Sequence, residues 1–292
     1  MAHLDKARIL IAESDRQIVQ AMKTSLHAAG FKKIRHVETV EKLETVLKEE
    51  PVDLLIAESR LKDGVTTPLV RRARMNDLGE DPFLPVITTV VSPEPDFVRR
   101  LIDDGPDDVI AKPFSAKILS DRIRRIVRGR KPFVITHDYI GPDRRLDSRE
   151  KPGPDAMPAR TFAVPNSLKR RIDGSPSRQS FHDLKVRTIN EMALARIEVQ
   201  TGAIVYQLNR VLPKVIDGQA NGMERNALDE VIGLSDQIVL ALPGTCYSSQ
   251  DMVFNTLSGL VMAIQSGKKE GLSDDVEQIQ KLKRILQRDF RL

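Results

Sequence analysis

The sequence predicts an α/β domain with a doubly wound, five-stranded parallel sheet, followed by a proline-rich segment and an all-α helical bundle. Three observations predict this order. Over residues 1–130, short apolar runs alternate with amphipathic stretches. Residues 131–182 hold seven of the 17 prolines and show little apolar periodicity. From residue 183 onward, apolar residues recur mostly every three or four positions, which is the period of an amphipathic helix.

The first domain, residues 1–130, contains five predicted strands and five predicted helices. The strands are expected at Arg8–Ala12, Ile34–Val37, Asp53–Ala57, Pro85–Val91 and Asp108–Ala111, and the helices at Gln17–Ala29, Val40–Glu49, Pro68–Asp77, Pro95–Asp103 and Ala116–Arg128. Strict alternation of strand and helix is typical of a parallel sheet that helices cover on both faces. Ligands of such sheets bind at the carboxyl ends of the strands.

Residues 131–182 are expected to form an extended, flexible linker, because proline, arginine, serine and aspartate dominate them. One patch inside this segment has larger apolar residues, Tyr139 and Ile140, next to a turn-forming Gly-Pro-Asp sequence. This patch either packs back on the first domain or binds a partner, or it is simply part of the linker.

Residues 183–292 are expected to form the helical bundle. A first helix of about 30 residues is predicted by one apolar stripe, formed by Val186, Ile189, Ala193, Ile197, Ile204, Leu208, Val211 and Val215. Three more helices are expected near 225–241, 249–266 and 273–290. The third of the four helices is apolar around most of its circumference, so Met252 and Met262 are expected in the core.

The formal net charge of +5 lies mainly in the proline-rich segment. The first domain carries a net charge of +2, the segment +4 and the helical domain −1. A DNA-reading domain normally concentrates lysine and arginine on itself, so nucleic acid is an unlikely partner. A transcriptional or RNA-binding regulator that contacts nucleic acid through the basic segment is the alternative interpretation.

Other features limit the class of protein. The sequence lacks the run of about 18 apolar residues that a membrane span requires, and its first residues lack the apolar stretch of a secretory signal. Cys246 is the single cysteine, which excludes an internal disulfide. We therefore expect a cytoplasmic protein. No histidine follows residue 182, so the helical domain lacks the phosphotransfer group of a histidine-containing bundle. We expect no cofactor, no metal and no enzymatic activity.

Four segments at the predicted strand ends carry a family resemblance. They are Arg8–Asp15 (RILIAESD), Val52–Glu58 (VDLLIAE), Leu84–Val90 (LPVITTV) and Asp107–Phe114 (DDVIAKPF). With these segments the first 130 residues resemble the receiver domain of response regulators, the phosphorylation-accepting module of two-component signalling. The resemblance implies an aspartate acceptor on the third strand, two acids after the first strand that bind Mg²⁺, a hydroxyl on the fourth strand and a lysine on the fifth.

At these positions the chain departs from the family pattern. The acceptor position holds Glu58, and the two positions of the acidic pair hold Glu13 and Ser14. The hydroxyl position holds Val90, so Lys112 is the one position that matches the family pattern. Ser14 lacks a metal-binding carboxylate and Val90 cannot donate a hydrogen bond. The glutamate side chain is one methylene longer than aspartate, which disturbs an in-line attack. We expect Glu58 to pair with Lys112 in a pseudo-receiver that is fixed in one conformation. A phosphorylated receiver and a merely structural α/β domain are the alternatives.

A charged surface on the first domain is a candidate partner site. Arg122 and Arg125 on the fifth predicted helix could face Asp104 and Asp108 of a second copy across a two-fold axis, or these residues simply form a solvated face. The helical domain is expected to act by self-association or by binding a protein partner of a signalling pathway.

Overall fold

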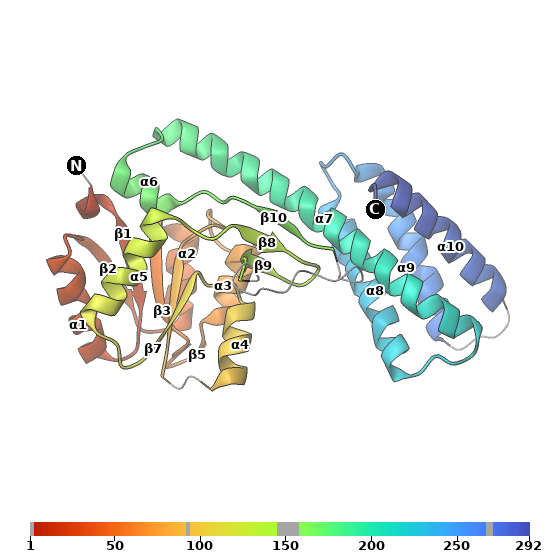
Figure 1. Cartoon of the computed structure of the whole chain (residues 1–292), viewed down its shortest axis with the longest axis horizontal. Helices are drawn as coiled ribbons and strands as arrows, with labels where there is room; N and C mark the ends of the chain where they lie inside the picture. The colour runs from red at the N-terminus through yellow and green to blue at the C-terminus, as the bar shows by residue number, and fades with distance from the viewer. Residues whose placement is uncertain (1–2, 92–93, 145–157, 267–270) are drawn as a thin grey trace. The chain divides into compact units, whose positions relative to one another are not determined.

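The computed structural model describes residues 3–91, 94–144, 158–266 and 271–292 (Figure 1). The chain forms two compact units. The first comprises Met1–Val134, Tyr139–Glu150 and Thr161–Ile189, and the second comprises Ile135–Asp138, Lys151–Arg160 and Asn190–Leu292. None of the helices in the described ranges combines the length and the apolar character that crossing a membrane requires.

The first unit is built on a five-stranded parallel sheet with the order β2-β1-β3-β6-β7. Its strands are β1 (Arg8–Ala12), β2 (Lys33–Val37), β3 (Leu54–Glu58), β6 (Val86–Val90) and β7 (Asp108–Ala111). A short hairpin, β4 (Arg60–Leu61) and β5 (Gly64–Val65), follows β3. The five predicted strands and the parallel sheet are confirmed.

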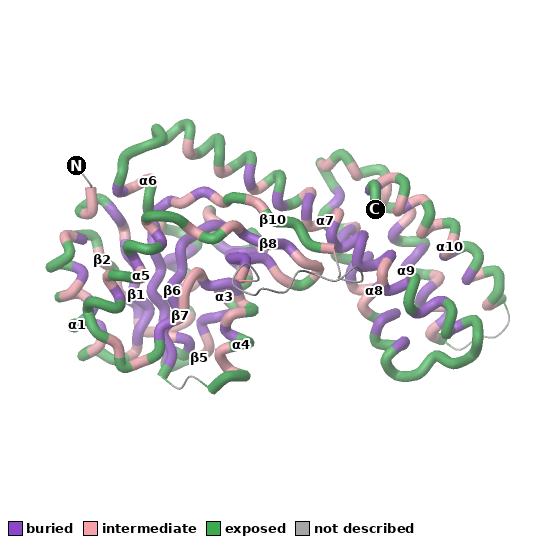
Figure 2. The backbone as a smooth tube through the Cα atoms, in the orientation of Figure 1, coloured by how far each residue is buried: buried purple, intermediate pink, exposed green. Residues whose placement is uncertain are grey.

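Helices cover both faces of this sheet, so its central strands are buried (Figure 2). The helices are α1 (Arg16–Ala28), α2 (Val40–Glu49), α3 (Thr67–Arg74), α4 (Pro95–Asp103) and α5 (Ala116–Arg128), and a 3-10 turn, η1 (Leu4–Lys6), precedes β1. Alternate residues of β1 enter different cores, because successive strand side chains point to opposite faces. Ile9 packs with side chains of α1 and α5, whereas Leu10 packs with side chains of α2 and α3.

The expectation of an extended linker over residues 131–182 is wrong for the part that the structure describes. It contains β8 (Phe133–Ile135), β9 (Ile140–Pro142) and β10 (Arg160–Phe162), which form a sheet with the order β10-β8-β9, and helix α6 (Ser167–Asp173). The few apolar residues among the prolines are the physical reason. Leu168 and Ile172 of α6 are fully buried in the core that Ile9 shares.

The Tyr139–Ile140 patch packs on the first unit. Ile140 is buried, the Tyr139 hydroxyl donates to the carbonyl of Pro142, and the guanidinium of Arg144 donates to the carbonyl of Pro106 at 2.7 Å. Of the two interpretations of this patch, the structure supports packing.

The helices of the second unit are α8 (Gly222–Ala241), α9 (Asp251–Gln265), α10 (Leu272–Asp289) and the residues of α7 (Arg178–Ile216) from Asn190 onward. A 3-10 turn, η3 (Ser248–Gln250), precedes α9. Their apolar stripes share one core, and α9 packs against both α8 and α10. The predicted bundle is confirmed, but the methionine prediction is wrong. Met252 is 74% exposed and Met262 is 49% exposed, because α9 buries only the face that Phe254, Leu257 and Val261 share.

Candidate functional site

The sheet brings the predicted site residues to one edge. Glu13 directly follows β1, Glu58 ends β3, Val90 ends β6 and Lys112 directly follows β7. Because the strands are parallel, these are all carboxyl ends, where open α/β sheets hold their ligands. The structure thus brings these predicted residues together at one edge, and their role as a functional site stays a prediction.

Lys112 bridges two carboxylates in this cluster. Its Nζ donates to Oε2 of Glu13 at 2.6 Å and to Oε1 of Glu58 at 2.8 Å. The side chains are nearly closed to solvent, with exposed fractions of 8% for Lys112, 1% for Glu13 and 12% for Glu58. Glu58 and Lys112 are thus paired as the sequence predicted, and Glu13 is a second acceptor that the prediction did not assign to Lys112.

Hydrogen bonds to the Glu13 carboxylate and to the backbone carbonyls of Glu13 and Glu58 hold these two residues in place. Oε1 of Glu13 accepts the backbone N–H of Asp15 at 3.0 Å, and the imidazole Nε2 of His36 lies 2.9 Å from the Glu13 carbonyl. On the other strand, the Thr66 hydroxyl donates to the carbonyl of Glu58 at 2.6 Å. Asp15 does not join the cluster, because its carboxylate caps the first turn of α1.

The cluster holds one cation for two carboxylates. Burial raises the pKa of Glu13 above its ordinary value, against the lowering effect of its hydrogen bonds to Lys112 and Asp15. Desolvation favours the neutral form of a carboxyl, whereas a hydrogen-bonded ammonium favours the charged form. For Glu13 the first effect is the larger one, so this site carries a carboxyl that takes up a proton more readily than a free glutamate.

Several hydroxyls beside the bridge make no hydrogen bond. Val90 is buried at the position where the family has a hydroxyl. Thr88 and Thr89 precede it on β6, and their buried Oγ1 atoms lack a hydrogen-bond partner among the described residues, as does Oγ of Ser14. Unpaired buried hydroxyls are unusual in a finished structural core.

The residues present do not fit the Mg²⁺ site that the resemblance implies. Mg²⁺ prefers carboxylate oxygens in a near-octahedral arrangement. Ser14 offers a hydroxyl instead, and Nζ of Lys112 already contacts an oxygen of each carboxylate. In the described ranges, no three or more His, Cys, Asp or Glu side chains are grouped as a metal site.

The structure places the predicted surface residues in different environments. Nη1 of Arg122 pairs with Oδ2 of Asp108 in the same chain at 3.2 Å. Arg125 is exposed on α5. Burial raises the pKa of Asp104, although the Thr67 hydroxyl bonds it. An interface that uses these residues stays a prediction.

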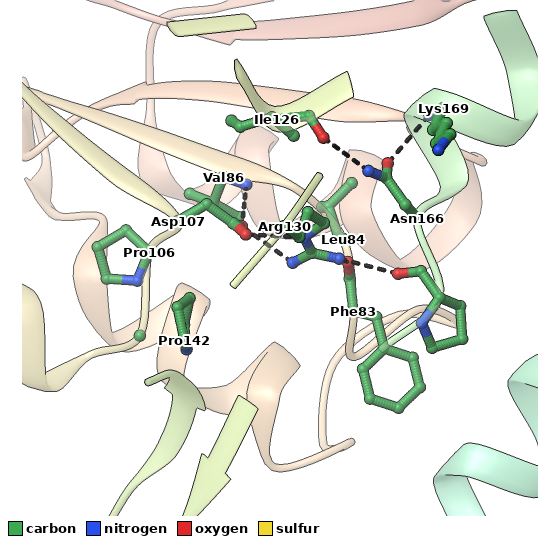
Figure 3. Close-up of polar contacts among 12 residues, drawn as sticks. Phe83, Leu84, Val86, Pro106, Asp107, Ile126, Arg130, Pro142, Asn166 and Lys169 are labelled. Atoms are coloured by element: carbon green, nitrogen blue, oxygen red, sulfur yellow. Dashed lines mark hydrogen bonds and ion pairs between the residues drawn. The ribbon is translucent and has the colours of Figure 1, made fainter. Parts of the chain in front are cut away.

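A second buried charge cluster lies at the amino ends of β6 and β7, and sequence reasoning missed it (Figure 3). Asp107 accepts from Nε of Arg130 at 2.8 Å and from Nη2 of Arg74 at 3.1 Å. Arg74 has no solvent exposure, and burial lowers its pKa to about 10. Both guanidinium groups lie over the ring of Phe133, at 5.1 and 5.0 Å from its centroid. The cluster therefore joins the Phe133 segment to the sheet.

Comparisons with known proteins show which family the N-terminal domain resembles. Residues 9–124 match the family model of the response regulator receiver domain. Over these residues the chain is similar to the response regulator receiver domain, as its residues predicted, and the sheet order β2-β1-β3-β6-β7 is that of its five-stranded parallel sheet.

Curated relatives match a stretch of similar length. The phosphate regulon transcriptional regulatory protein PhoB of Rhizobium meliloti is 30% identical over 132 residues, which are 44% of this chain and 56% of the relative. PhoB of Escherichia coli is 27% identical over 128 residues, covering 44% of this chain and 55% of the relative. The chain thus spans about half the length of these curated relatives. A solved structure, the chemotaxis response regulator CheY4 of Vibrio cholerae, is 18% identical with a TM-score of 0.38 and covers 41% of this chain and 97% of its own.

Proposed function

We propose that the chain is a response regulator whose receiver domain is a pseudo-receiver, not phosphorylated at Glu58 and held in one conformation. The observation that carries this proposal is the position of Lys112 Nζ between Glu13 and Glu58, at 2.6 and 2.8 Å. The carboxylate at the acceptor position already has its lysine partner. A phosphoryl group would have to displace this buried ion pair.

The chemistry of the other positions supports the same proposal. Ser14 and Val90 replace a metal ligand and a phosphoryl-binding hydroxyl. Transfer of a phosphoryl group depends mainly on positioning and on electrostatic stabilisation of the developing charge. Without these two groups, the site provides little stabilisation of the charge that would develop as the carboxylate of Glu58 attacks a phosphoryl group.

Intact mass spectrometry tests this proposal. The full chain is incubated with acetyl phosphate and Mg²⁺, and its mass is compared with that of an untreated sample. We expect no gain. A stable gain of one phosphoryl group that disappears in Glu58→Gln contradicts the pseudo-receiver.

The output of the chain is proposed to be protein contact through the helical unit, without enzymatic activity. Exposed large apolar residues support this. On α8 and α9, Leu240 is 83% exposed and Met252 is 74% exposed. Sedimentation velocity of the full chain against the double variant Leu240→Glu/Met252→Glu tests self-association. A wild-type oligomer that is lost in the variant supports self-association. A wild-type chain that stays monomeric at all concentrations contradicts self-association, and the proposed partner is then a different protein.

A nucleic-acid-binding regulator is the second candidate, favoured by the name of the PhoB relatives as transcriptional regulatory proteins. The matching region is the receiver domain, and the net charge of residues 183–292 is −1. Binding to random-sequence duplex at low salt distinguishes the candidates. Tight binding that weakens steeply with salt supports the nucleic-acid candidate.

A further inference from the structure

A cleft of about 480 Å³ lies in the first unit, at the edge of the sheet opposite to the Lys112 cluster. Arg8 at the start of β1, Asp53 just before β3 and Leu84 just before β6 line it, so it opens at the amino ends of the strands. Helices α6 and α7 supply its other side. Cavities of about 300–1,000 Å³ are typical of small-molecule sites.

Two helix faces bring basic groups to this cleft. On α6, Arg170 and Arg171 line it. On α7, Arg178, His182 and Lys185 line it at spacings of four and three residues, which place them on one face of the helix. This stretch was predicted to be the end of a basic linker and the start of a helix. The convergence of its cations on one cleft was therefore not predicted.

Two guanidinium groups of the cleft share one carboxylate, and the Nε of a third has no partner among the described residues. Asp53 accepts from Arg8 at 2.9 and 3.0 Å and from Nε of Arg171 at 3.2 Å. Nε of Arg170 is buried and lacks a hydrogen-bond partner among the described residues. Desolvation, followed by the neighbouring charge of Arg171, lowers the pKa of Arg170. Asp53 therefore serves both Arg8 and Arg171, and Asp81, which also lines the cleft, interacts electrostatically with Lys185.

An aromatic surface and an acidic rim complete the cleft. The guanidinium carbon of Arg170 lies 5.8 Å from the centroid of the Phe181 ring, which presents a flat stacking surface. Glu49, Glu50 and Glu80 also line the cleft and are exposed. Exposed charges are screened by salt, whereas the partly buried guanidinium groups are screened much less.

We propose that this cleft binds a small anion with adjacent phosphate groups, of the size of a nucleotide. Guanidinium groups match phosphate oxygens with paired hydrogen bonds, which lysine cannot do as well. The guanidinium group of Arg170, which lines the cleft, and the exposed Arg178 would receive the phosphates, and the ring of Phe181 would lie beside a planar base. Such a ligand would make the receiver domain respond to a metabolite instead of to phosphorylation.

Isothermal titration of the full chain with inorganic pyrophosphate and with ATP tests this proposal. We expect saturable binding of at least one probe at low salt, weakened about tenfold or more by Arg170→Ala and by Arg178→Ala, since a charge-assisted contact of roughly 1.4 kcal/mol corresponds to a factor of ten. Comparable binding of pyrophosphate and ATP points to the phosphates alone, and tighter binding of ATP that falls in Phe181→Leu points to the base as well.

Arg124→Ala is the matched control, because Arg124 is exposed on α5, pairs with Asp121 and does not line the cleft. If Arg170→Ala does not fold, the exposed position of Arg178 keeps the test decisive. The proposal is overturned if neither probe binds at millimolar concentration. It is equally overturned if the cleft variants bind as well as Arg124→Ala.

Discussion

The two edges of the five-stranded sheet hold buried charge clusters of opposite composition. At the carboxyl edge, one cation, Lys112, lies between the carboxylates Glu13 and Glu58. At the amino edge, one carboxylate, Asp107, lies between the guanidinium groups of Arg74 and Arg130. The first cluster has an excess negative charge and the second an excess positive charge.

The clusters differ in how fully their polar groups are bonded. The guanidinium groups at the amino edge donate their remaining N–H groups to backbone carbonyls, those of Pro82, Phe83, Leu84, Gly105 and Pro165. At the carboxyl edge, the buried hydroxyls of Thr88 and Thr89 make no hydrogen bond among the described residues. An extensively bonded cluster is typical of a structural clamp, whereas buried hydroxyls without partners are unusual in a purely structural core.

The largest expected effect is at the amino edge. Asp107→Asn removes the carboxylate that is ion-paired with both Arg74 and Arg130, and it leaves these two buried cations without that direct partner. We expect a loss of about 3–5 kcal/mol in the free energy of unfolding, the cost of breaking a buried ion pair from one side. Urea denaturation followed by circular dichroism measures it. Asp103→Asn, at an exposed position on α4, is the control. A loss below about 1 kcal/mol contradicts the clamp.

Removing the cation at the carboxyl edge should cost about 3 kcal/mol at neutral pH, the lower end of the same range, because Glu58 is partly exposed. Lys112→Met leaves both carboxylates without their ammonium. Protonation of Glu13, whose pKa is raised by burial, relieves part of this, so the stability deficit of the variant should shrink as the pH falls toward 4.5. Urea midpoints at pH 7 and pH 5 measure the difference. An equal loss of stability at both pH values contradicts the assignment of Lys112 as the cation that stabilises these carboxylates.

A smaller effect is expected where α6 joins α5. The Asn166 side chain accepts the backbone N–H of Lys169 and donates to the Ile126 carbonyl at 2.7 Å, so it caps one helix and ties it to another (Figure 3). Asn166→Ala should cost about 1–2 kcal/mol. Thermal unfolding checks this. Asn166→Asp keeps the cap and loses only the donor, so it should lie between Asn166→Ala and the wild type.

The smallest effect is expected from Glu13→Gln. Burial raises the pKa of Glu13 in the folded protein, so ionisation of Glu13 disfavours folding at neutral pH. Below the unfolded pKa of about 4.5, both states hold the proton and this contribution vanishes. Glu13→Gln should therefore raise stability at pH 7, and the gain should shrink as the pH falls to 4.5. A gain that grows toward low pH contradicts the sign of the shift.

The sequence predicted the sheet because its signals are local. The apolar runs of β1 and β7 begin and end where the structure has them, and their order along the chain determines the parallel topology. The carboxyl-edge site followed from the same order, since each of Glu13, Glu58 and Lys112 lies at the end of a strand.

The amino-edge cluster could not be predicted in this way. Arg74 and Arg130 lie on either side of Asp107 at distances of 33 and 23 residues along the chain, and each reads as an exposed charge within a polar stretch. Helix α6 was also not predicted. It lies in a proline-rich segment, and its two buried apolar residues, Leu168 and Ile172, are too few to produce a recognisable helical periodicity. Burial of these residues depends on contacts distant in sequence.

The most direct test of the pseudo-receiver is binding of beryllofluoride, an analogue of a phosphoryl group, followed by ¹⁹F NMR in the presence of Mg²⁺. The account predicts no bound signal for the wild-type chain and a bound signal for the combined variant Ser14→Asp/Glu58→Asp/Val90→Thr, which restores the missing groups. A saturable bound signal in the wild-type chain, lost in Glu58→Gln, would contradict the claim that Lys112 closes this site.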